Sequence, residues 1–295
     1  MLFICIFLIT FGLMKILVTG GAGFIGTNLC SSLSKDHDIY SIDNYSIGSK
    51  LNHVEGVSYI DGDVVDIFDH FDKNDFDICF HLAGLSRIQP SFTIPLNTFH
   101  ANTTGTQNVL EWCRTNKTKV VYSGSSSKHH DPYQSPYALY KYLGEEICKM
   151  YRQVYKMDIE IARFYNVYGP KEIIDGDWAA VLGIWRRQIR DGKNITIVGD
   201  GEQRRDFTHV QDIVNGLIKI SEFKKRHHDA WELGSGKNYS INELASFFIE
   251  RFGCEVNYIE DQQGNYRETL REHDDALEEL DWRPKDRLKD YVMNL

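Results

Sequence analysis

The stretch from Met14 to Asn44, MKILVTGGAGFIGTNLCSSLSKDHDIYSIDN, decides the fold of this chain. Lys15 to Thr19 is a short run rich in β-branched residues, which predicts a buried strand. Three glycines at three-residue spacing follow it and open an apolar segment compatible with a helix: Gly20, Gly23 and Gly26. A second apolar strand, Ile39 to Ile42, is closed by Asp43. The order is therefore strand, glycine turn, helix and strand ending in an acid.

This arrangement is suited to a dinucleotide. Glycines let backbone amides approach a pyrophosphate, and the helix N-terminus adds its partial positive charge. Asp43 stands at the distance where a carboxylate accepts hydrogen bonds from an adenosine ribose, and it would repel a 2′-phosphate. NAD is therefore favoured over NADP. The predicted cofactor-binding residues of this stretch are Gly20, Gly23, Phe24, Ile25, Gly26, Asp43 and Asn44.

Size and charge limit the possible classes of protein. The chain has 295 residues and a mass of 34.1 kDa, enough to bury a large core. Its 42% apolar and 25% charged residues are ordinary for a globular protein. The net charge of −9 argues against a nucleic-acid partner or an anionic membrane surface. An anionic substrate would therefore need arginines of its own.

The cysteines are scattered along the chain without C-x-x-C pairs: Cys5, Cys30, Cys79, Cys113, Cys148 and Cys254. Several lie in apolar patterns, so we expect reduced core residues and a cytoplasmic protein. No metal site is predicted.

Residues 1–13, MLFICIFLITFGL, form an apolar segment that is too short for a spanning helix. It has neither a basic region nor a small-residue cleavage site, so it is a poor signal peptide. We interpret it as an upstream start or a non-essential extension, with a short membrane-associating tail as the alternative. Stable membrane insertion is not expected.

Strand and helix patterns alternate through the first half, which predicts a doubly wound, Rossmann-type parallel sheet in the α/β class. Further strands are expected at Val57–Ile60, Ile78–Leu82, Lys119–Tyr122 and Ile159–Phe164, and helices at Asn97–Cys113 and Tyr137–Tyr155. After residue 170 the pattern loosens, with helices expected at Ala179–Arg190, Val210–Phe223 and Ile241–Phe252 and strands at Ile195–Val198 and Ala230–Leu233. We expect a dinucleotide-binding domain over 14–168. A smaller α/β substrate-binding domain over 169–295 would return some elements to the main sheet.

A serine and a tyrosine–lysine pair predict chemistry at the strand ends. The fifth strand runs into a serine cluster that includes Ser125, and Tyr137 and Lys141 follow four residues apart on one helical face. An ammonium near a phenol favours the phenolate, so we expect Lys141 to lower the pKa of Tyr137. Such a phenolate takes a proton from an alcohol while hydride leaves the carbon for a nicotinamide.

At this point the chain resembles the extended short-chain dehydrogenases/reductases that act on nucleotide sugars, from Met14 to Leu295. The motifs that carry the resemblance are GGAGFIG (20–26), DGDV (61–64), HLAG (81–84), NTTGTQNVLE (102–111), QSPYALYK (134–141), RFYNVYGP (163–170), GDGEQRRDFTHVQD (199–212) and WELGSGKNYSINELA (231–245).

The resemblance implies roles by position. Tyr137 would be the base, Lys141 its activator and a ribose ligand, and Ser125 the hydroxyl partner. Further cofactor contacts are implied for Asp63, Val64, Leu82, Ala83 and Gly84. Asn166 and Arg205 resemble the residues that contact the substrate diphosphate, and the resemblance implies that Ser125 would also contact the sugar. Members usually pair through the helices at 97–113 and 137–155, which implies a homodimer.

Simpler interpretations stand beside several of these roles. Arg204 and Arg205 could form surface salt bridges, and Asn166 could shape the turn before Gly169. His81 fits a packed histidine at a strand end. His129 and His130 fit a solvated loop better than a metal site.

Departures from the family pattern decide the expected reaction. The 4,6-dehydratases of this family carry an Asp-Glu pair where this chain has Ser126 and Ser127, and the decarboxylases have a glutamate in the same region. Without a second acid–base group, the resemblance implies a 4-epimerase that works through a transient 4-keto sugar with tightly held NAD. A 4-keto reductase or dehydratase-type enzyme of the same family remains open, as does a non-catalytic NAD-binding regulator. The sugar and the nucleotide are not determined.

Overall fold

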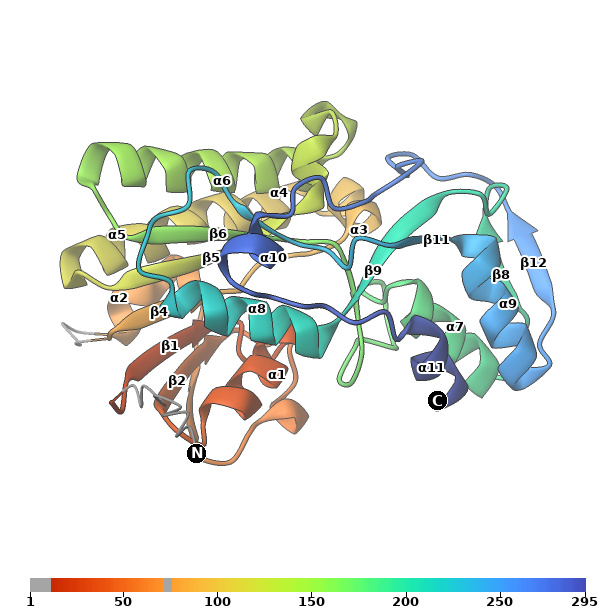
Figure 1. The fold of residues 1–295 in the computed structure, drawn as a ribbon, viewed down its shortest axis with the longest axis horizontal. Helices are drawn as coiled ribbons and strands as arrows, with labels where there is room; N and C mark the ends of the chain where they lie inside the picture. The colour runs from red at the N-terminus through yellow and green to blue at the C-terminus, as the bar shows by residue number, and fades with distance from the viewer. Residues whose placement is uncertain (1–11, 72–75) are drawn as a thin grey trace, which may run out of the picture.

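A parallel sheet of seven strands forms the centre of the molecule (Figure 1). The computed structural model describes residues 12–71 and 76–295, so the predicted extension at 1–13 lies almost entirely outside the described residues. The strand order is β10-β6-β5-β4-β1-β2-β3, and each neighbouring pair is parallel. The seven strands are β1 (Lys15–Thr19), β2 (Asp38–Asp43), β3 (Val57–Asp61), β4 (Ile78–His81), β5 (Lys119–Ser125), β6 (Ile159–Phe164) and β10 (Trp231–Leu233). The predicted fold class is confirmed.

Helices cover both faces of this sheet. One layer holds α2 (Ile67–His70), α4 (Pro95–Phe99), α5 (Gly105–Asn116) and α6 (Pro136–Tyr155), and the other holds α1 (Phe24–Leu33), α8 (Val210–Glu222) and α10 (Asp275–Glu279). Because successive strand residues point to opposite faces, Ile16 and Val18 pack with the α1–α8 layer while Leu17 packs with the α5–α6 layer. This pattern explains why β1 reads as a continuous apolar run.

The strand order reverses beside β1, which pairs with β2 on one side and β4 on the other. Crossovers on the two sides of such a switch point leave a crevice at the carboxyl ends of the strands. The glycine turn follows β1 at this edge, and the serine cluster ends β5, which is separated from β1 by β4 alone. The topology thus brings the two predicted parts of the site together.

Much of the second half packs around a core of its own. This core joins α7 (Val181–Arg190), α9 (Ile241–Phe252), α11 (Leu288–Met293), β8 (Ile195–Val198) and β12 (Val256–Ile259). A three-stranded sheet connects it to the site in the order β11 (Asn238–Ser240), β9 (Arg204–His209) and β7 (Asn166–Tyr168). By contrast, α8 packs on the main sheet, and β10 is a strand at the edge of that sheet. The domain division at residue 168 stays a prediction.

The helix expected over 97–113 is divided. It consists of α4, a π-helical turn at His100–Thr104 and α5, while a separate short helix, α3 (Ile88–Thr93), precedes it. The wider turn brings Asn102 inward, where its side chain hydrogen-bonds both backbone groups of Leu85 at 2.8 and 2.9 Å. The π-turn therefore fixes the loop after β4, which borders the site.

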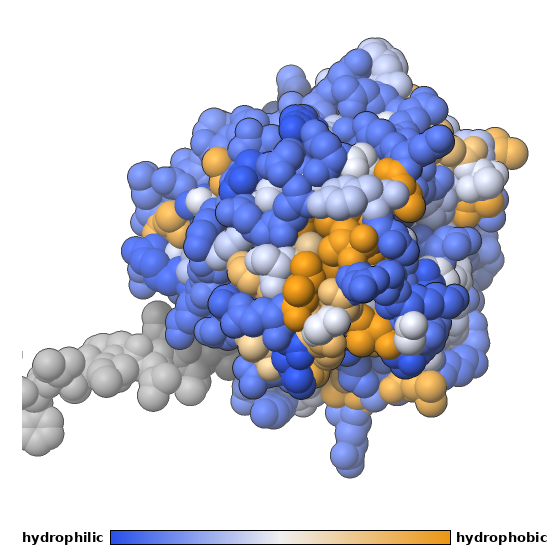
Figure 2. Space-filling view, turned by 90° about the vertical axis from the view of Figure 1, so that its right-hand side faces the viewer, coloured by the Kyte–Doolittle hydropathy of each residue, from blue (hydrophilic) through white to orange (hydrophobic). Residues whose placement is uncertain are grey.

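The end of the molecule formed by α7, α9 and β12 carries exposed apolar surface. Figure 2 looks onto this end and shows apolar side chains gathered near its centre and rimmed by hydrophilic ones. Ile249 on α9 and Ile259 on β12 are exposed. Within the described ranges, no helix combines the length and apolar character needed to cross a bilayer.

Candidate active site

The glycine turn brings two stretches of backbone into close contact. Gly20 has φ +73°, and a Cβ there would lie 2.9 Å from both N and Cα of Ala83. A Cβ on Gly26 would lie 2.7 Å from Cα of Gly21. Only glycine fits these positions, and α1 starts at Phe24 with its N-terminus directed at the crevice. This geometry fits a bound pyrophosphate.

The carboxylate of Asp43 is held at the end of β2 by two backbone amides. It accepts hydrogen bonds from Ala22 N at 3.0 Å and Tyr45 N at 2.8 Å. Burial raises the pKa of Asp43, and these two hydrogen bonds oppose the rise. Asn44 donates to Asp63 at 2.7 Å next to it. The acid is thereby fixed on the wall of the crevice, as a ribose-binding carboxylate requires.

One cavity of about 830 Å³ runs from the glycine turn to the second core. All of the residues predicted to bind cofactor or substrate or to act in catalysis border it: Gly20, Gly23, Phe24, Ile25, Gly26, Asp43, Asn44, Asp63, Val64, Leu82, Ala83, Gly84, Ser125, Tyr137, Lys141, Asn166 and Arg205. The fold therefore brings the whole predicted set together, and the individual roles remain proposals.

Ser125 and Tyr137 form a hydrogen-bonded pair in this cavity. The Tyr137 hydroxyl donates to Ser125 Oγ at 3.2 Å. Ser125 is the last residue of β5, and Tyr137 lies in the first turn of α6, where Ser135 caps the helix by accepting from Ala138 N at 3.1 Å. The cap and Pro136 fix the helix start, so the phenol is positioned against the strand end.

Lys141 lies one turn further along α6 and is buried. Its ammonium donates to the carbonyl of Ser123, and burial lowers its pKa to about 8 while the Glu145 carboxylate opposes this shift. Burial raises the pKa of the Tyr137 phenol, against the effects of Ser125 and of the Arg87 charge. The predicted lowering of the phenol pKa is therefore wrong here, because desolvation outweighs the opposing effects of Ser125 and Arg87, and Lys141 is not among the groups that shift the phenol pKa.

The lowered pKa of Lys141 predicts that the difference in unfolding free energy between the wild type and the Lys141→Met variant depends on pH. Between pH 8 and 10.5, Lys141 has lost its proton when folded but keeps it when unfolded. Raising the pH through this window therefore stabilises the wild type relative to the variant, by at most about 3 kcal/mol. Denaturant unfolding of both proteins at several pH values measures this difference, and a flat profile would contradict it.

A buried charge network behind Ser125 was not predicted from the sequence. Arg163 contacts Glu145 at 2.9 Å and Glu232 at 3.0 Å, and Glu145 also accepts from Ser125 N at 3.4 Å. His129 extends the network through Glu232 at 2.8 Å. One signal was available, since Glu145 follows Lys141 by one turn on the same face of α6. The network holds the end of β5 in place.

Arg204 and Arg205 differ in their surroundings. Arg204 pairs with Glu243 at 2.9 Å, so the salt-bridge interpretation holds for it. Arg205 instead turns to the cavity and contacts Asn265 at 2.5 Å, and burial lowers its pKa to about 10. Asn166 donates to Thr269 at 3.1 Å on the same wall.

The histidines fall into two groups. His81 is fully buried between Thr19 (2.8 Å) and Thr106 (3.1 Å), which agrees with a packed strand-end residue. His129 is bound to Glu232; burial works against protonation, but this carboxylate raises the histidine pKa. His130 stacks on Tyr266 with ring centroids 3.9 Å apart. The expectation of a solvated loop at these two residues is therefore wrong.

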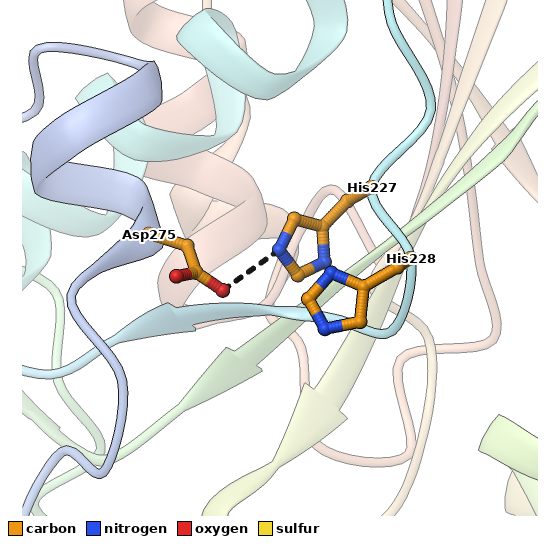
Figure 3. Close-up of side chains that lie close together, drawn as sticks. All are labelled: His227, His228 and Asp275. Carbon is orange, nitrogen blue, oxygen red and sulfur yellow. Dashed lines mark hydrogen bonds and ion pairs between the residues drawn. The ribbon is translucent and has the colours of Figure 1, made fainter.

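A second histidine cluster lies before β10, at the opposite edge of the sheet from the cavity (Figure 3). Nitrogen or oxygen atoms of His227, His228 and Asp275 lie within 4.8 Å of one another. His227 Nδ1 accepts from Asp229 N at 3.2 Å, so Nε2 carries the ring proton and donates it to Asp275 at 3.0 Å. A metal bound to Nε2 would place the ring proton on Nδ1, where it would face the N–H of Asp229, one donor against another. His227 and Asp275 therefore form a hydrogen-bonded pair, and the His228 ring lies next to it.

The fold and the site together define an NAD-binding enzyme of the short-chain dehydrogenase/reductase type. A sequence profile of the NAD dependent epimerase/dehydratase family matches residues 16–234, and the chain belongs to this family.

Known relatives are similar over nearly the whole chain. A putative UDP-glucose 4-epimerase of Methanocaldococcus jannaschii is 30% identical, over 94% of this chain and 95% of that protein. UDP-N-acetylglucosamine 4-epimerase from Methanobrevibacter ruminantium M1, solved with UDP-N-acetylmuramic acid, has a TM-score of 0.85 at 27% identity, covering 96% and 97% of the two chains. UDP-glucuronic acid 4-epimerase from Bacillus cereus, solved with UDP-glucuronic acid and NAD, has a TM-score of 0.83 at 27% identity, covering 95% and 96%.

Proposed function

We propose that the protein is an NAD-dependent nucleotide-sugar 4-epimerase. The observation that carries this proposal is the Ser125–Tyr137 pair, 3.2 Å apart, in the same cavity as the glycine turn. The positions after Ser125 hold Ser126 and Ser127, and the nearby Glu145 is engaged by Arg163 behind the strand. The phenol is thus the acid–base group beside Ser125, which suits oxidation and reduction at one carbon.

The chain's own residues bind the sugar, orient it and move one proton. Ser125 holds the 4-oxygen of the sugar by a hydrogen bond, and Tyr137 removes the proton of the 4-hydroxyl and later returns it. Bound NAD supplies the redox chemistry, which is reversible removal of hydride from C4. Asn166 and Arg205 hold the diphosphate while the 4-keto sugar turns to present its other face. Residues 14–168 would bind the cofactor and 169–295 the nucleotide sugar.

We also propose a cytoplasmic homodimer. Apolar side chains are exposed on α4 and α6, including Leu96, Met150 and Val154, and burying them against a second copy would be favourable. The free cysteines of the described residues suit a reducing compartment: Cys30, Cys79, Cys113, Cys148 and Cys254. Sedimentation at twice the chain mass is the expected result, and a monomer would contradict the pairing.

Incubation of the purified protein with UDP-, GDP-, dTDP- and CDP-sugars tests the proposal. Chromatography is expected to show interconversion of 4-epimers without net change in nicotinamide absorbance. A 4-keto reductase would instead consume reduced cofactor stoichiometrically. A non-catalytic regulator would bind NAD and convert no sugar, and either result would overturn the epimerase proposal.

A further inference from the structure

Three arginines border the cavity without an ion pair among the described residues: Arg87, Arg187 and Arg205. Arg187 donates to Gly176 O and has the Asp175 carboxylate as a charged neighbour, which leaves Arg87 and Arg205 to be considered. Other arginines near the site are neutralised, as Arg163 is by Glu145 and Glu232. A desolvated cation without an anion is costly, and a bound anion removes that cost. The surroundings of Arg87 and of Arg205 are therefore each suited to a bound anion.

Hydrogen bonds to two backbone carbonyls orient the Arg87 guanidinium. Nε donates to Trp178 O at 3.0 Å and Nη1 to Ser86 O at 2.9 Å, while Nη2 has no partner among the described residues. Its charged neighbours are the Tyr137 phenol and Glu172. Glu172 is already bound by Arg186 at 2.8 Å. Arg87 thus has donors to spare next to the proposed base.

Arg205 occupies a different place in the cavity. It contacts Asn265, and its titratable neighbours are Tyr266 and His130, neither of which is an acid that would neutralise it. Arg87 and Arg205 therefore have separate surroundings and would bind separate anions. Under the proposed function Arg205 takes the diphosphate, which leaves the group at Arg87 to be assigned.

We propose that Arg87 binds a carboxylate carried by the hexose ring, so that the substrates are nucleoside-diphosphate sugar acids. This inference rests on the proposed function, which brings the 4-hydroxyl of the sugar to Tyr137. A substituent on the adjacent ring carbon, C3 or C5, then lies beside the same phenol, within reach of Arg87. A guanidinium fork is suited to a carboxylate at that position.

Binding to the NAD-loaded protein tests the assignment without depending on turnover. Calorimetry would compare four ligands. UDP and UDP-glucose carry no carboxylate, UDP-glucuronate carries one at C5, and UDP-N-acetylmuramate carries one on its 3-O-lactyl group. We expect one acidic sugar to bind more tightly than UDP-glucose. Arg87→Met should weaken it on the order of 10- to 100-fold and leave UDP within about 3-fold. Arg87→Lys should restore part of this loss.

Arg205→Met provides the matched comparison, because it should weaken all four ligands together. The acidic sugar that loses affinity in Arg87→Met identifies whether the carboxylate sits at C5 or C3. Equal weakening of UDP and the acidic sugars by Arg87→Met would overturn the inference. So would a wild-type preference for UDP-glucose. If acidic sugars bind selectively through Arg87 but no epimer forms, the inference stands and the proposed function fails. If only neutral sugars are converted to their epimers, the proposed function stands and the inference fails.

Discussion

Replacing Tyr137 by phenylalanine is expected to lower kcat for epimerisation roughly 1000-fold, within the range found for the loss of a general acid–base group. The phenol is the hydroxyl that donates to Ser125 Oγ at 3.2 Å, so removing it leaves the serine in place but deletes the proton acceptor. NAD content and nucleotide-sugar affinity should change little, since the ring remains. Steady-state rates and calorimetry on the same preparations measure both.

Tyr140→Phe is the matched control for this variant. Tyr140 lies on the same helix and contacts the Phe99 ring edge-on at 5.3 Å, but it does not border the cavity. Its variant should keep wild-type kcat. A loss of less than about 10-fold in Tyr137→Phe would show that another group moves the proton.

The raised pKa of the phenol has a consequence for pH dependence. Burial disfavours the phenolate, and the Arg87 cation counteracts this. The phenolate needed to accept a proton is therefore formed more readily as the pH rises. The kcat of the wild type should increase with pH on the alkaline side, and the increase should be absent from Tyr137→Phe.

The main sheet could be predicted because its strands are buried on both sides and read as apolar runs, such as Ile159 to Phe164. The small strands β7, β9, β11 and β12 could not. Arg204 to His209 and Asn238 to Ser240 are mostly polar, and they become strands because they pair across the sequence. Their existence depends on tertiary contacts, which local patterns do not contain.

The site was predictable to the extent that its residues are fixed by spacing. Tyr137 and Lys141 are one helical turn apart, and the glycines are set by local backbone geometry. The network of Arg163 with Glu145 and Glu232 joins residues 18 and 69 positions apart, so no local pattern reveals it. The direction of the phenol pKa also required the structure, because burial of one hydroxyl is a property of the whole cavity.

Gly26→Ala is expected to weaken NAD binding roughly 100-fold. The new Cβ would lie 2.7 Å from Gly21 Cα and 2.9 Å from Gly20 C, all of it backbone that cannot move aside as a flexible side chain can. The turn must open, which displaces the amides that face the pyrophosphate, and a displacement of about 1 Å can cost two orders of magnitude. Titration of protein stripped of cofactor measures the affinity.

Gly216→Ala separates this effect from general destabilisation. Its Cβ would lie 2.8 Å from both Cδ atoms of Leu233, inside the core between α8 and the sheet and away from the cavity. Both variants should lose about 1 to 3 kcal/mol of unfolding free energy, because the added methyl group overpacks the turn in one case and the core in the other. Only Gly26→Ala should lose NAD. Equal NAD affinity in the two variants would mean that the turn tolerates a side chain, and that the pyrophosphate is held elsewhere than at the N-terminus of α1.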